Sequence, residues 1–108
     1  MSKKNNFLIY QNEKGNIKID VKFEDKTIWL NQTQICELFG KAKSTISEHI
    51  KAILEEEELD VSTIRNYRTV QTEGSREVAR TIDHYNLDMI IAIGFRVRSS
   101  TGTKFRLN

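Results

Sequence analysis

Between Trp29 and Leu54 the sequence contains two short amphipathic segments, one on either side of a glycine. Asn31 is a good N-cap for the first segment, in which apolar residues recur at helical spacing at Ile35, Leu38 and Phe39. Gly40 follows, and a glycine can adopt the left-handed conformation that turns the chain sharply. The second segment begins near Lys43 or Ser44, and its apolar face consists of Ile46, Ile50, Ile53 and Leu54. The sequence therefore predicts two helices joined by a tight turn.

The other face of the second predicted helix is polar, with the side chains of Lys43, Ser44, Ser47, Glu48 and Lys51. Such a face suits the major groove of DNA, where base edges need donors and acceptors and phosphates need positive charge. Two short helices joined in this way are the layout of a DNA-binding helix-turn-helix. Lys41 departs from that pattern, because an apolar residue usually follows the glycine of the turn. A helical hairpin in the core of another kind of domain remains the alternative.

Strand patterns precede the two helices. Ile17, Ile19, Val21 and Phe23 alternate with charged residues, which predicts one half-buried strand. Residues 7–10 can pair with it through a turn that contains Gly15, and residues 27–30 can follow it through the turn 24–26. We therefore expect a small N-terminal antiparallel β-sheet that leads directly into the helices. After the helices come four glutamates, residues 55–58, which we expect to form a solvated helix end facing away from DNA.

A second β-rich region begins at Ile64. Two runs of β-prone residues, 64–72 and 78–85, flank a turn at Gly74 and Ser75, and this pattern predicts a β-hairpin. A hairpin directly after a helix-turn-helix is the arrangement of a winged helix, in which the wing contacts the phosphate backbone. The hairpin carries four arginines that could make such contacts: Arg65, Arg68, Arg76 and Arg80.

The last predicted element is a short helix that Asn86 caps and Gly94 ends, with Leu87, Ile90 and Ile91 on its apolar face. The basic segment 99–108 and the polar segment 1–6 are expected to be flexible. The whole chain of 108 residues then forms a single α+β domain of the winged-helix type, in which the helix-turn-helix lies between the N-terminal sheet and the hairpin wing.

Composition excludes several classes of protein. A single cysteine cannot form a disulfide within the chain, and one cysteine with two histidines gives no metal-ligand cluster of recognised spacing. The apolar run at residues 7–10 is too short for a signal-peptide core or a membrane span, so a cytoplasmic protein without membrane contact is expected. The net charge is +2, and the excess of basic residues lies C-terminal to residue 60.

The chain resembles the virulence RhuM family of bacterial proteins. The most specific pieces are TIWLNQTQICELFGKAKSTISEHIKAILEEEEL (residues 27–59) and TIDHYNLDMIIAIGFRVRSSTGTKFR (residues 81–106). Family members continue past this point, so the resemblance implies an N-terminal DNA-binding module or a truncated relative. The expected partners are double-stranded DNA, a second copy of the chain, and a further C-terminal domain or protein partner.

Catalytic chemistry is not expected, and neither is a cofactor or a metal. Cys36 has no histidine beside it in the predicted fold and suits close packing between the helices. His84 and Asp83 fall on opposite faces of a strand, and the glycines form no phosphate-binding loop. Sequence-specific binding of double-stranded DNA, as in transcription regulation, is the leading hypothesis. Its candidate residues are Lys43, Ser44, Thr45, Ser47, Glu48 and Lys51 with Arg65, Arg68, Arg76 and Arg80. The alternative is a protein-interaction module, like an antirepressor or a toxin-regulating segment, that does not read DNA.

Overall fold

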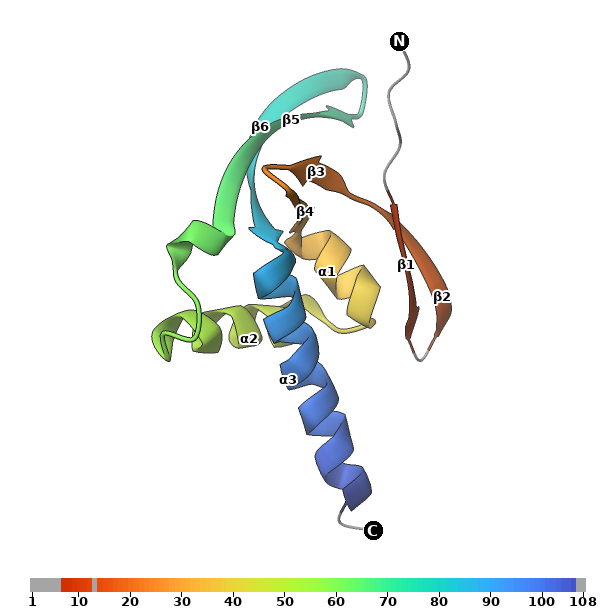
Figure 1. Cartoon of the computed structure of the whole chain (residues 1–108). Coiled ribbons are helices and arrows are strands. Elements are labelled where there is room, and N and C mark those ends of the chain that lie inside the picture. Colours follow the sequence, from red (N-terminus) through yellow and green to blue (C-terminus); the bar gives the residue numbers. More distant parts are fainter. Residues whose placement is uncertain (1–6, 13, 107–108) are drawn as a thin grey trace.

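The computed structural model describes residues 7–12 and 14–106, which form three α-helices and antiparallel β-strands (Figure 1). The strands β1 (Phe7–Asn12) and β2 (Gly15–Asp20) pair with each other in a two-stranded sheet. A second sheet has the order β3-β4-β6-β5, in which β3 (Lys22–Glu24) and β4 (Thr27–Asn31) form a hairpin. The fold class is therefore α+β, as the sequence predicts, but the N-terminal strands belong to two sheets.

The predicted single strand from Ile17 to Phe23 is wrong, because the chain leaves one sheet and joins the other at Val21. Helix α1 takes part in this break, since the amide Nε2 of Gln34 donates a hydrogen bond to the carbonyl oxygen of Asp20 at 2.8 Å. The change of sheet also changes which side chains are covered. Ile19 is 3% exposed, whereas Phe23 is 59% exposed.

The two helices predicted around Gly40 are confirmed as α1 (Gln32–Phe39) and α2 (Lys43–Glu55). The side chain of Asn31 accepts a hydrogen bond from the backbone of Gln34, whose own side chain accepts one from the backbone of Asn31. This capping box satisfies two of the free N–H groups at the start of α1. Gly40 has a φ of 65°, so it ends the helix in the left-handed conformation that glycine adopts without strain.

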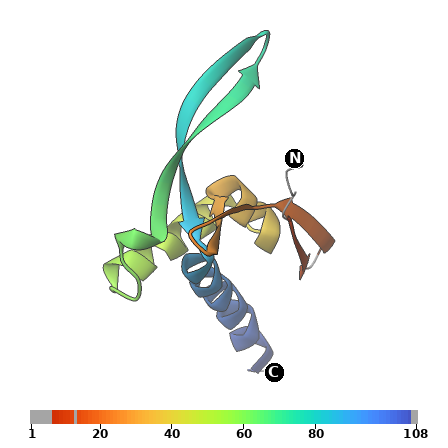
Figure 2. The same cartoon turned by 45° about the horizontal axis from the view of Figure 1, so that its top comes forward.

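A short 3₁₀ turn, η1 (Val61–Thr63), connects α2 to the long hairpin of β5 (Ile64–Glu73) and β6 (Arg76–Asn86). The hairpin is confirmed, and its turn contains Gly74 at a φ of 67°. Only the base of the hairpin joins the sheet, through the pairing of β6 with β4. The rest extends as a curved arm away from the three helices (Figures 1 and 2). We call residues 66–83 of this hairpin the arm.

The last helix, α3 (Leu87–Arg106), has 20 residues and is much longer than predicted. Asn86 caps it as expected, because its Oδ1 accepts a hydrogen bond from the backbone N–H of Met89 at 3.1 Å. Gly94 does not end the helix. A Cβ at this position would lie 3.0 Å from the ring of Phe39, so the glycine lets α3 approach α1. The expected flexible segment 1–6 lies outside the described residues, while the backbone of residues 99–106 continues α3.

The core lies where the three helices meet one face of the second sheet. Its most deeply buried side chains, each less than 2% exposed, are Leu30, Ile35, Leu38, Ile46, Ile53, Met89 and Ile93. The β1–β2 hairpin covers one side of α1, where the rings of Tyr10 and Phe39 make an edge-on contact at 5.5 Å. This packing holds α2 against α1 and α3 by its apolar face and leaves its other face exposed.

Candidate nucleic-acid interface

The exposed face of α2 carries the five polar side chains that the sequence places there. Lys43, Ser44, Ser47, Glu48 and Lys51 are all exposed, and Thr45 is half-buried at their edge. Lys43, Ser47 and Lys51 are spaced four residues apart and form one row, with Ser44 and Glu48 beside it. The buried side chains Ile46, Ile50 and Ile53 lie on the opposite face. We call these five exposed residues the outer face of α2.

Gln32 connects α1 to the start of this outer face. Its Nε2 donates a hydrogen bond to the backbone carbonyl of Lys43 at 3.2 Å and another to the hydroxyl of Ser47 at 2.5 Å. The two contacts orient the first turns of α2 relative to α1. The role of Gln32 cannot be predicted from local sequence, because its partners are 11 and 15 residues away and the packing of the two helices brings them together.

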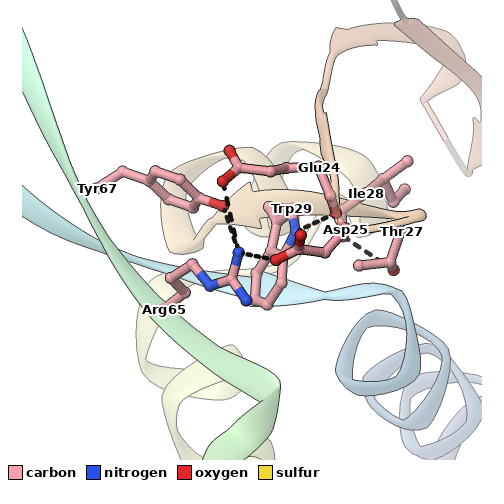
Figure 3. Close-up of polar contacts among 7 residues, drawn as sticks. All are labelled: Glu24, Asp25, Thr27, Ile28, Trp29, Arg65 and Tyr67. Carbon is pink, nitrogen blue, oxygen red and sulfur yellow. Dashed lines mark hydrogen bonds and ion pairs between the residues drawn. The ribbon is translucent and has the colours of Figure 1, made fainter.

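Arg65 lies at the base of the β5–β6 hairpin and contacts side chains of the β3–β4 hairpin (Figure 3). Its Nη1 lies 2.5 Å from Oδ2 of Asp25 and 3.6 Å from Oε2 of Glu24, and its guanidinium group stacks on Trp29 at 4.5 Å. The hydrogen bond to Asp25 raises the pKa of Arg65 above its already high usual value. Arg65 therefore joins β5 to the turn between β3 and β4.

The arginines of the arm differ in whether they form an ion pair with another described residue. Arg80 makes two parallel hydrogen bonds to the carboxylate of Glu73, at 2.7 and 2.8 Å, and these bonds lower the pKa of Glu73. Arg68 and Arg76 are exposed, and neither makes an ion pair within the described part of the chain. Of the four arginines predicted from the sequence, Arg68 and Arg76 are thus the ones whose charge is not already paired.

An aromatic cluster supports the base of the arm on the face of the sheet opposite the core. The ring of Tyr67 makes edge-on contacts with Trp29 at 6.1 Å and with His84 at 5.0 Å. The ammonium group of Lys22 lies over the same ring, 4.6 Å from its centre. Local sequence patterns do not predict this cluster, because its aromatic members come from three strands whose order is set by the tertiary fold.

The acidic segment after α2 is exposed, as expected for residues 55–58, but two of its carboxylates are engaged. Glu56 and Glu58 lie 2.8 and 3.2 Å from Nη2 of Arg96 on α3. The acidic segment is therefore exposed to solvent and also connects the end of α2 to α3 through ion pairs.

Cys36, His84 and Asp83 are the residues that the sequence raises as candidates for catalytic chemistry. Burial raises the pKa of Cys36, which favours the protonated form of its thiol. His84 is buried with Nδ1 3.0 Å from the carbonyl of Ile82, while Asp83 is exposed on the other face of β6. Among the residues described by the structure, no three His, Cys, Asp or Glu side chains are grouped closely enough to hold a metal ion.

Comparisons with known proteins place the chain beside one family. No curated protein and no solved structure matches it. In the described residues, no helix combines the length and apolar character needed to cross a membrane. The model of the Virulence protein RhuM family matches residues 62–107, a segment that contains the arm and α3. This match supports the assignment of the chain to the virulence RhuM family.

Proposed function

We propose that this chain binds double-stranded DNA in a sequence-dependent way, with the outer face of α2 in the major groove and the arm against the phosphate backbone. The observation that carries the proposal is the outer face itself. A helix that follows a tight turn presents a continuous row of lysine, serine and glutamate side chains to solvent, while its other face is fixed in the core. The proposed fold type is a winged helix, and the proposed role is in transcription regulation.

The chemistry of the outer face suits base recognition. Lysine donates hydrogen bonds to guanine O6 and N7, and glutamate accepts one from cytosine N4. Lys43, Ser44 and Glu48 occupy the first turns of α2, where recognition helices reach base edges. Thr45, Ser47 and Lys51 lie at positions that suit phosphate contacts. The contacts of Gln32 support the same function, because a recognition helix must keep a fixed orientation to read bases.

The arm supplies the proposed nonspecific contacts. Arg68 and Arg76 are exposed on an extended hairpin and make no ion pair with another described residue, so their charges are available to phosphates. Arg80 can join them only if it exchanges its bond to Glu73 for a phosphate. Arg65 is proposed to act indirectly, by fixing the base of the arm to the sheet.

The experiment that tests this proposal is selection of bound duplexes from a random pool, followed by titration of the best site by fluorescence anisotropy. We expect a preferred sequence and an affinity that falls steeply with salt, because each phosphate contact releases counterions. Glu48→Ala should reduce the preference at one base pair by about 1–3 kcal/mol. An equal change in affinity for all duplexes would show that Glu48 does not contact a base.

A pair of neighbouring variants tests the role of Gln32. Gln32→Ala should weaken binding to the preferred site more than binding to random duplex, because it loosens the start of α2. Thr33→Ala, at the exposed next position of α1, is the matched control and should leave both affinities unchanged. Equal behaviour of the two variants would remove Gln32 from the recognition mechanism.

A protein-interaction module is the second candidate, and exposed apolar side chains on α3 favour it. Ile91 and Phe95 are 59% and 71% exposed. No binding to any duplex at low salt, together with a salt-insensitive complex with a protein, would favour this candidate over DNA recognition.

A further inference from the structure

Helix α3 has an apolar stripe that nothing in the described fold covers. Its inner face is buried through Met89, Ile90 and Ile93. Its outer face carries apolar side chains four residues apart, with exposed fractions that rise along the helix: Leu87 at 40%, Ile91 at 59% and Phe95 at 71%. We call these three residues the α3 stripe. Ordinary surface helices do not repeat large apolar residues at this spacing on their solvent side.

The α3 stripe borders an open groove of about 290 Å³ between α3 and the segment after α2. Leu59, Ile91, Ala92 and Phe95 form its apolar lining, and the carboxylates of Glu58 and Asp88 lie at its edges. Val61, which is 75% exposed, lines a second groove next to this one. An occupant of this groove therefore needs an apolar face and a basic group.

The same helix offers both features. Arg98 is exposed one turn beyond Phe95, so α3 carries an acidic group at one end of the stripe and a basic group at the other. Helices with this charge pattern attract each other when they run in opposite directions. We propose that the α3 stripe is a dimer interface, in which two copies of this chain pair through antiparallel α3 helices.

The sequence spacing sets the register of this dimer. In an antiparallel pair of identical helices, facing residues have numbers that add up to a constant. If Ile91 faces the partner's Phe95, then Asp88 faces the partner's Arg98, and the two-fold axis repeats both contacts. The apolar contacts and the charge pairs therefore require one and the same register. A parallel arrangement would instead place Asp88 next to the partner's Asp88.

The first test is the molar mass of the full chain in the absence of DNA, measured by light scattering over a range of concentrations. We expect a species with twice the mass of one 12.6 kDa chain at high concentration. Phe95→Glu should raise the dissociation constant at least about tenfold, since it places a charge in an apolar contact. Val70→Glu is the matched control, because Val70 is an exposed apolar residue on the arm and should leave the dimer unchanged. A monomer at every concentration would overturn the proposal, as would a Phe95→Glu protein that dimerises with the same dissociation constant as the native chain.

The second test uses charge exchange to establish the direction of the helices. Asp88→Arg alone and Arg98→Asp alone should each weaken self-association, because each places like charges opposite each other. A mixture of the two variants should form a heterodimer with two opposite-charge pairs, of which one has the native sign and the other the reversed sign. Circular dichroism should give the same helix content for both variants and the native chain. Failure of the mixture to associate, when both variants are folded and the native chain dimerises, would overturn the antiparallel register. Because no DNA is present, these results do not depend on the proposed DNA binding.

Discussion

At the scale of single residues, two glycines show how one residue type serves two purposes. Gly40 has a positive φ and ends α1, as its place after an apolar helical pattern predicts. Gly94 has the same local setting, but it lies inside α3 because the ring of Phe39 occupies the space of its missing side chain. The first role can be recognised locally, whereas the second depends on a contact between distant helices.

Gly94→Val should destabilise the protein by about 1–3 kcal/mol, because the added side chain would collide with the ring of Phe39 in a packed core. Urea unfolding followed by circular dichroism measures the effect. A gain in stability, as expected for removal of a glycine from a free helix, would mean that α3 does not approach α1 as closely as described.

The environment of His49, a half-buried residue of α2, predicts that the stability of the protein depends on pH. Burial, and next the positive charge of Arg96, lower the pKa of His49 in the folded protein. The unfolded chain therefore binds this proton more tightly, and protonation favours unfolding. Stability should be greatest above the ordinary histidine pKa of about 6.5 and should fall as the pH drops through that value.

The measurement for His49 is the urea midpoint of the native chain and of His49→Gln between neutral pH and pH values just above the range where carboxylates titrate. The native midpoint should fall more than that of the variant, which keeps His84 as an internal control. Parallel curves would mean that the pKa of His49 does not change on folding.

At the scale of elements, α2 separates a structural face from a candidate binding face. Ile46 is fully buried, so Ile46→Ala should cost about 2–5 kcal/mol of unfolding free energy. Lys43→Ala changes an exposed residue three positions away and should be nearly neutral for stability while it weakens DNA binding. Thermal unfolding compares the two variants, and an unchanged midpoint for Ile46→Ala would contradict the packing of α2.

The arm is the element whose contribution to DNA binding can be measured separately. If Arg76 and Arg80 both contact phosphates, their joint replacement by alanine should reduce the slope of log K against log salt by roughly 0.9 for each contact. Glu73→Gln weakens the partner of Arg80 and should make the slope steeper. Identical slopes for all three proteins would mean that the arm does not touch DNA.

At the scale of the whole molecule, the fold places its candidate surfaces on separate projections. The arm extends from one end of the sheet, and the C-terminal half of α3 extends in another direction beyond the core (Figures 1 and 2). The outer face of α2 is distinct from the α3 stripe, because α2 contacts α3 through its buried face. Dimerisation through α3 is therefore compatible with an exposed outer face.

Dimerisation should appear in the stability of the whole molecule. If two folded chains associate through the α3 stripe, the thermal midpoint should rise with protein concentration, since association stabilises only the folded state. Phe95→Glu should reduce this concentration dependence. Calorimetry at several concentrations measures it, and a constant midpoint for the native chain would contradict a stable dimer.

The local features of this protein follow from its amino-acid sequence alone. Asn31 and Gly40 mark the ends of α1, the spacing of isoleucines defines the two faces of α2, and the Gly74 turn separates two β-rich runs, because caps, helical periodicity and turns depend on nearby residues. The same local patterns were sufficient to predict which residues form the outer face of α2.

Which of these elements contact one another depends on the tertiary fold. In the tertiary structure, the predicted strand is divided between two sheets at Val21, and α3 continues past Gly94. Arg65 and Arg80 form ion pairs with carboxylates. Each of these outcomes depends on partners brought together by packing, and Arg65 illustrates this most clearly, since Asp25 and Trp29 lie on a different hairpin. Local spacing contains no information about such contacts, because they are set by the order and register of the strands and by the close approach of distant helices.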